Sequence, residues 1–227
     1  MKSLHSNLFV LFLSFFPALG YSQESQPEPA RGSVLPGFII TLKGDTVKGY
    51  LLNINLWQNQ KMTFFYTDPN DQKGRVRYTP KEIRAYQVGP RYYESTKHPF
   101  TNSIHAENFL LRKVDGEIKY YVWYYDEDKS KLLVWDKITL DDIGKAFIFD
   151  ESELWKQEFG KKKNQETIME FDFKFLLKFT RNMSDYVKDD VELAQKITNK
   201  TEGYKNINID AIIREYNAWY LNTRQKK

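Results

Sequence analysis

Residues 108–125 read NFLLRKVDGEIKYYVWYY, two runs rich in β-branched and aromatic residues that flank Asp115-Gly116. Asp-Gly between two such runs is typical of a two-residue hairpin turn. The stretch therefore predicts two antiparallel strands, 108–114 and 117–125. Successive side chains of a strand point to opposite faces, so the second strand has one face made of Ile118, Tyr120, Val122 and Tyr124, which we expect to lie in the core.

The opposite face of that strand carries three aromatic residues at every second position. These are Tyr121, Trp123 and Tyr125, and Trp135 on the next predicted strand extends the set. If this face is exposed to solvent, its aromatic rings can stack against a sugar ring or a peptide. Alternatively, helices from the C-terminal part cover it. Tyr121, Trp123, Tyr125 and Trp135 are the candidate ligand-binding residues.

Further short β-prone runs surround this hairpin. Residues 38–54 (FIITLKGDTVKGYLLNI) predict a second hairpin with a two-residue turn at Gly44-Asp45. The remaining runs are 62–66, 75–78, 83–88, 91–95, 131–135 and 146–149. Their spacing, without a helical pattern between them, predicts an antiparallel meander that forms a barrel or a sandwich.

The hydrophobic period changes after Asp150. Phe171, Phe175, Leu176 and Phe179 share one helical face, and Val191, Ala194 and Ile197 share another after Asp189-Asp190. The longest stripe is Ile209, Ile212, Ile213, Tyr216, Trp219 and Tyr220. The predicted fold is α+β, with a β-rich domain over 37–150 and three short helices in a subdomain over 151–227 that packs on it.

The N-terminal segment has the layout of a secretory signal peptide. Lys2 and His5 precede an apolar run over 8–16, and small residues follow. The run is too short for a membrane-spanning helix. We expect cleavage after Ser22, or alternatively after Gly20, and a flexible linker over 23–36 with three prolines. The expected location is the periplasm or the extracellular space.

Composition excludes several classes of protein. The 227 residues include no cysteine, which excludes disulfides, cysteine-ligated zinc, iron–sulfur clusters and the lipid anchor of bacterial lipoproteins. The net charge of +4 is too small to indicate nucleic-acid binding. No second long apolar run follows, so we expect no transmembrane segment after cleavage.

The titratable residues do not form a recognisable catalytic or metal motif. His98 and His105 lie in a predicted loop without a spacing that enforces metal binding. Residues 68–79 fail the calcium-loop pattern at its glycine and its final glutamate. The acidic clusters 126–128 and 141–142 suit solvated turns better than a pair of glycosidase carboxylates. We therefore expect no catalytic residues, no metal and no cofactor.

Three motifs resemble uncharacterised exported proteins of Bacteroidota-type bacteria. They are the opening region from Gly37 through Gly44-Asp45-Thr46 to Gly49, the Tyr78-Thr79-Pro80 step, and the closing helix with Glu215-Tyr216-Asn217. The resemblance implies export and a β-rich fold with a short helical end, and it implies no mechanism.

Together these features favour an exported, soluble, non-catalytic protein of the cell envelope that acts as an interaction or ligand-binding domain. Its partner would be an envelope protein or a glycan. The alternative is a glycan-binding module or a glycan-active hydrolase that uses the aromatic strand face.

Overall fold

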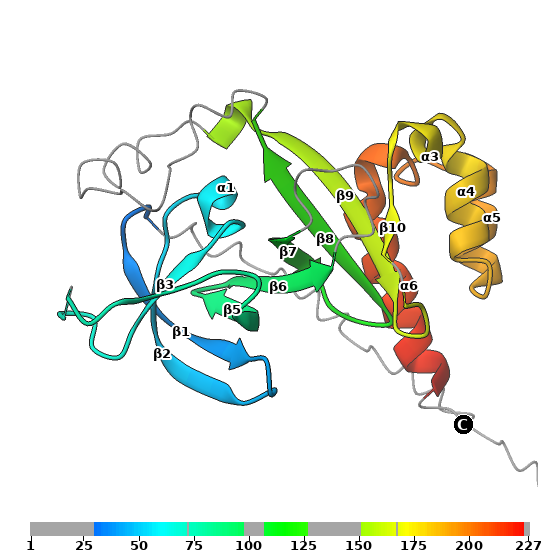
Figure 1. The fold of residues 1–227 in the computed structure, drawn as a ribbon. Helices are drawn as coiled ribbons and strands as arrows, with labels where there is room; N and C mark the ends of the chain where they lie inside the picture. Colours follow the sequence, from blue (N-terminus) through cyan, green and yellow to red (C-terminus); the bar gives the residue numbers. More distant parts are fainter. Residues whose placement is uncertain (1–29, 72, 98–106, 127–150, 167, 225–227) are drawn as a thin grey trace, which may run out of the picture.

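The computed structural model describes residues 30–71, 73–97, 107–126, 151–166 and 168–224. Within them, ten strands form one antiparallel sheet, and short helices follow, so the predicted α+β class is confirmed (Figure 1). The strands are β1 (Val34–Thr41), β2 (Thr46–Leu52), β3 (Thr63–Tyr66), β4 (Val76–Tyr78), β5 (Ile83–Val88), β6 (Arg91–Lys97), β7 (Glu107–Val114), β8 (Ile118–Tyr125), β9 (Trp155–Lys162) and β10 (Met169–Glu170). The helical elements are α1 (Leu56–Asn59), η3 (Glu151–Glu153), α3 (Phe173–Leu177), α4 (Phe179–Tyr186), α5 (Val191–Thr198), η4 (Asn206–Asn208) and α6 (Ile209–Arg224).

The sheet consists of two meanders joined at β1. Its order is β10-β9-β8-β7-β6-β5-β1-β2-β3-β4, so β5 returns to pair with β1 after β4 has formed the far edge. Figure 1 shows α3 to α6 gathered beside β8 and β9, with α1 and β1 to β5 at the other end of the molecule.

Both predicted hairpins are present, but their turns are longer than two residues. Between β1 and β2, the Gly44 N–H donates to the Thr41 carbonyl at 3.0 Å, and Gly44 adopts a left-handed φ of 100°. Asp45 then forms the extra position before β2 begins. Residues 115–117 separate β7 from β8. In each case the glycine of the predicted turn lies in the connection, but the loop around it is longer than two residues.

The sheet extends further along the chain than the hydrophobic period predicts. We expected the helical part to begin at 151, yet β9 and β10 occupy part of that segment and the first α-helix there begins at Phe173. β9 pairs with β8 along its whole length, from Ile118↔Lys162 to Tyr125↔Trp155. Its alternating apolar positions are few and lie among charged residues, which is why the strand pattern was missed. The predicted strands at 131–135 and 146–149 lie outside the described residues.

The expected first helix is divided into α3 and α4. Lys178 departs from helical geometry (φ −115°, ψ 33°), and Asn182 Nδ2 donates to the Phe175 carbonyl at 3.0 Å across the break. Asp172 caps α3 and Asp190 caps α5, each accepting a backbone N–H, and Asp190 confirms the predicted helix start. The segment after β10 thus forms two short helices at an angle.

The helices pack on the face of β8 that holds Ile118, Tyr120 and Val122. The predicted stripe of α6 is confirmed, since Ile209, Ile212, Ile213 and Tyr216 are all buried. The expected face of α5 is confirmed at the buried Ile197 and wrong at Val191, which is 73% exposed. Leu193 makes the other buried contact of this helix.

Gly160 in β9 permits this close packing of the helices. A Cβ there would stand 2.6 Å from Phe171 Cζ and 2.9 Å from the Tyr186 hydroxyl. No helix in the described part of the chain is both long and apolar enough to span a membrane.

A second core lies between β1 to β3 and β5 to β7. It is centred on Tyr86, which stacks on Tyr93 with 4.8 Å between ring centroids and meets Phe109 edge-on at 4.9 Å. The Tyr86 hydroxyl donates to the Asn59 carbonyl at the end of α1. The β2–β3 connection is therefore buried in the molecule. It contains five buried polar residues, Asn53, Asn55, Gln58, Asn59 and Gln60.

Two side-chain amides close the β7–β8 ladder at its ends. The ladder runs from Leu111↔Val122 to Val114↔Tyr120. At one end, Gln60 accepts from the Tyr124 N–H at 2.8 Å and donates to the Tyr124 carbonyl at 3.3 Å. At the other end, Asn217 of α6 makes the same pair of bonds with Ile118, both at 2.8 Å. These amides replace the strand partner that β7 no longer supplies.

We expect Gln60→Ala to lower the free energy of unfolding by about 2 kcal/mol, because two partly buried backbone groups of Tyr124 lose their side-chain partner. Urea denaturation measures the effect. The matched control is Gln195→Ala on the exposed side of α5, which we expect to change stability by less than about 0.5 kcal/mol. Equal effects of the two substitutions would contradict the role assigned to Gln60.

Candidate functional site

The predicted aromatic face is largely closed. Tyr121 and Trp123 are buried, Tyr125 is half-buried, and Trp135 lies outside the described residues. The expected cover by the C-terminal helices is wrong, because those helices pack on the opposite face of β8. Leu110 and Phe159 of the neighbouring strands pack against Tyr121 and Trp123 instead.

Charged residues cover the Tyr121 end of this face. The Tyr121 hydroxyl donates to Glu94 at 2.9 Å, and Arg112 and Lys119 each lie 3.5 Å from the same carboxylate. The Arg112 guanidinium also lies 3.9 Å from the centroid of the Tyr92 ring. This network holds β6, β7 and β8 together, and it explains Tyr121 without a ligand.

The exposed end of the aromatic face includes a residue that the sequence interpretation missed. Trp155 pairs directly with Tyr125, so the two side chains share a face, and Trp155 is 60% exposed. The Tyr125 ring stacks on Trp123 with centroids 4.9 Å apart. The alternation of Trp155, Gln157 and Phe159 is the signal that could have placed Trp155 there.

The other candidates from the sequence yield no site. His98, His105, Asp141 and Asp142 lie outside the described residues. In the segment tested against the calcium-loop pattern, Asp71 accepts the Gly74 N–H at 3.0 Å, as in an ordinary polar turn. Within the described ranges, no group of three or more histidine and acidic side chains is placed to hold a metal ion.

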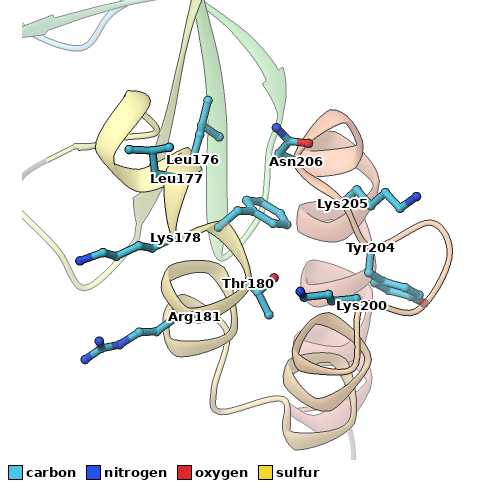
Figure 2. Close-up of a pocket in the computed structure, with 10 residues that line it drawn as sticks. Leu176, Leu177, Lys178, Thr180, Arg181, Lys200, Tyr204, Lys205 and Asn206 are labelled. Atoms are coloured by element: carbon cyan, nitrogen blue, oxygen red, sulfur yellow. The ribbon is translucent and has the colours of Figure 1, made fainter.

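A groove of about 580 Å³ lies in the helical part (Figure 2). One wall is the α3–α4 junction, from Leu176 to Arg181, and the other is the segment after α5, with Lys200 and residues 204–206. The break between α3 and α4 at Lys178 lies in this first wall. Leu176 and the buried Phe179 form its apolar part.

The charge of the groove has one sign. Its lining includes four cationic side chains, Lys178, Arg181, Lys200 and Lys205, and none of the described lining residues is acidic. Figure 2 shows Lys200 and Thr180 on opposite walls pointing into the space between them, whereas Lys178 and Arg181 extend outward from one wall and Lys205 from the other. Such a lining attracts anions through its summed field.

Lys200 has an unusual backbone conformation. It is the one non-glycine residue with a positive φ, 54°, in the part of the chain that the structure describes. The Lys200 N–H donates to the Ile197 carbonyl and the Thr201 N–H to the Lys196 carbonyl, both at 3.0 Å. These bonds form a Schellman motif, whose left-handed position usually holds glycine. A lysine side chain is therefore retained at a conformational cost.

One neighbouring carboxylate, on α6, is engaged with other residues. Glu215 of α6 lies 3.0 Å from Lys196 and accepts the Tyr204 hydroxyl at 2.9 Å. These contacts fix Tyr204 at the wall of the groove and pair the Glu215 carboxylate with Lys196.

A second hollow, of about 560 Å³, lies between the β9–β10 hairpin and α4, and its lining holds both acidic and basic residues. Among them, Glu170 accepts a hydrogen bond from Gln157. Burial raises the pKa of Glu170 to about 7, and the nearby Asp172 carboxylate contributes in the same direction. The mixed charge gives this hollow no preference for one class of ion.

The raised pKa of Glu170 predicts a pH-dependent stability. The ordinary pKa is 4.5 and the folded value about 7, so the folded state retains a proton that the unfolded state loses, and the stability contributed by this group falls as pH rises across that interval. We expect Glu170→Gln to be more stable, relative to the unsubstituted protein, at about pH 8 than at about pH 5 in urea denaturation. The exposed Glu166→Gln is the control. A difference that is the same at both pH values would contradict this origin.

The basic groove was not predictable from local composition. Residues 151–227 hold 15 basic and 13 acidic side chains, so no excess of positive charge marks the segment. The four cations come from two stretches that meet only in the folded chain. In comparisons with known proteins, no family model, curated protein or solved structure matches this chain.

Proposed function

We propose that this chain is an exported, non-catalytic protein of the cell envelope that binds an anionic ligand in the groove between the α3–α4 junction and the segment after α5. In the described part of the chain, the groove is lined by four cationic side chains and no carboxylate, which supports a negatively charged ligand. The signal-peptide pattern of residues 1–22 supports export.

The single observation that carries the proposal is Lys200. A left-handed non-glycine residue costs about 1 kcal/mol or more, and glycine at the same position would avoid the cost. Residues held in such conformations cluster at functional sites. Because Lys200 also points into the groove (Figure 2), its ammonium group is the natural centre of an anion site.

The lining also indicates the shape of the ligand. The cations are spread over both walls, so they suit several negative charges, or one charge beside an apolar group, better than a single small ion. Leu176 and Phe179 offer the apolar contact. A pocket of this volume accepts a ligand of small-molecule size.

Lys200→Gly separates binding from folding. We expect the free energy of unfolding to rise by up to about 1 kcal/mol, because the left-handed strain is removed. We expect affinity for anionic probes to fall about threefold to tenfold at low salt, because one charge at the centre of the site is lost. NMR titration with glycerol 3-phosphate and with trigalacturonate measures the affinity, and urea denaturation measures the stability.

The control for that titration is Lys48→Gln on the exposed surface of β2, which should bind both probes as the unsubstituted protein does. The expected shifts lie in residues 176–181 and 200–206, and added salt should weaken them. If neither probe shifts these residues, or if Lys48→Gln and Lys200→Gly reduce affinity equally, the groove is not an anion site.

A second candidate function is glycan binding at the exposed end of the aromatic face. The observation in its favour is that Trp155 is exposed beside Tyr125, which offers an aromatic surface to a sugar ring. Tyr121 and Trp123 take part only as buried support.

For this candidate we expect the protein to bind neutral oligosaccharides on a glycan array. Trp155→Ala should abolish this binding, because the exposed Trp155 ring is the stacking surface. The control is Leu221→Ala, which removes an exposed apolar side chain from α6. Retention that survives Trp155→Ala, or the absence of any retained neutral glycan, would exclude this site.

A further inference from the structure

Exposed apolar side chains border the basic groove. Phe173 is 74% exposed and Leu177 66% exposed, and they lie one turn apart on α3, so they share a side of that helix. On the other wall, Ile207 is 84% exposed and follows directly after Asn206, which lines the groove. A large apolar side chain that remains mostly exposed adds little to the core. Leu177 lines the opening, Phe173 lies one turn before it on α3, and Ile207 follows the lining residue Asn206.

Cationic residues alternate with these apolar side chains. Lys178 directly follows Leu177 at the end of α3, and Lys205 lies two residues before Ile207. Lys174, also on α3, lines the second hollow instead. Asp172, at the start of α3, is engaged as the helix cap. Exposed apolar residues among lysines and arginines are typical of surfaces that lie in the interface of a bilayer containing anionic lipids.

We infer that this end of the helical part docks on an anionic membrane surface. The inference rests on the proposed anion-binding function and narrows its ligand to the headgroup of an anionic phospholipid. The phosphate lies in the groove beside Lys200, while Phe173, Leu177 and Ile207 enter the boundary between headgroups and acyl chains. Leu176 and Phe179 line the same groove.

Charge complementarity favours a membrane over an acidic protein as the occupant. An acidic protein surface would leave Phe173, Leu177 and Ile207 without an apolar partner unless it carried a matching patch. An anionic bilayer offers negatively charged headgroups to the cations and acyl chains to the apolar side chains. The three apolar side chains come from two separate segments, α3 and η4, and both border the same opening.

The test is co-sedimentation of the protein with vesicles. One set contains phosphatidylglycerol and phosphatidylcholine in equal parts, and the other contains phosphatidylcholine alone. We expect binding to the anionic set only. The double variant Leu177→Ser with Ile207→Ser should lower the partition coefficient about tenfold or more, since both apolar contacts are lost. Lys205→Gln should lower it about fivefold, as expected for one basic charge near an anionic surface.

The matched control is Leu42→Ser, which removes an exposed apolar side chain from the β1–β2 turn, beside Lys43 and far from the helices (Figure 1). It should leave vesicle binding unchanged. Because all substituted side chains are exposed, circular dichroism should show each variant folded. Loss of binding in Leu42→Ser equal to that in the double variant would overturn the assigned surface.

The remaining outcomes separate the two proposals. If glycerol 3-phosphate shifts the groove residues but anionic vesicles do not bind, the membrane inference is wrong and the anion site stands. If vesicles bind and the double serine variant binds equally well, apolar insertion is wrong. If polyglutamate binds in the groove and vesicles do not, an acidic protein replaces the membrane as the partner. If no anionic probe binds, both proposals fail.

Discussion

The fold depends on how β8 is held where β7 leaves it. A strand inside a sheet must pair its backbone groups on both sides, and an unpaired group away from water is costly. β8 pairs with β9 along its full length but with β7 over only part of it. Gln60 and Asn217 complete the pairing at Tyr124 and Ile118. One amide comes from the first meander and the other from the last helix.

This arrangement also positions the candidate site. Asn217 ties α6 to the start of β8, and Gly160 allows Phe171 and Tyr186 to approach β9 closely. The helices are therefore fixed against a rigid surface at two places. The break at Lys178 and the turn at Lys200 then face one another at the outer side of the helical part, where the groove opens. The sheet is thus the rigid scaffold, and the irregular helix ends carry the charged side chains of the groove.

Sequence patterns predicted the fold best where one principle acted alone. Strand 83–88 matched β5 at both ends, and the period of α6 identified its buried face. β9 was missed because its apolar positions lie among lysines and glutamates. Val191 was misassigned because two faces of α5 fit the same spacing. The groove was beyond prediction, since its charges meet only through the break at Lys178 and the turn at Lys200.

The buried α1 segment also sets the order in which this chain can become native. The Asn59 carbonyl needs the Tyr86 hydroxyl, the Gln60 carbonyl needs the Phe109 N–H, and the Gln60 amide needs the backbone of Tyr124. These partners follow Gln60 by up to 64 residues. The entropy cost of closing such long loops comes before the contacts can stabilise the chain, and this slows folding. During synthesis, the first meander therefore stays incomplete until β8 has emerged.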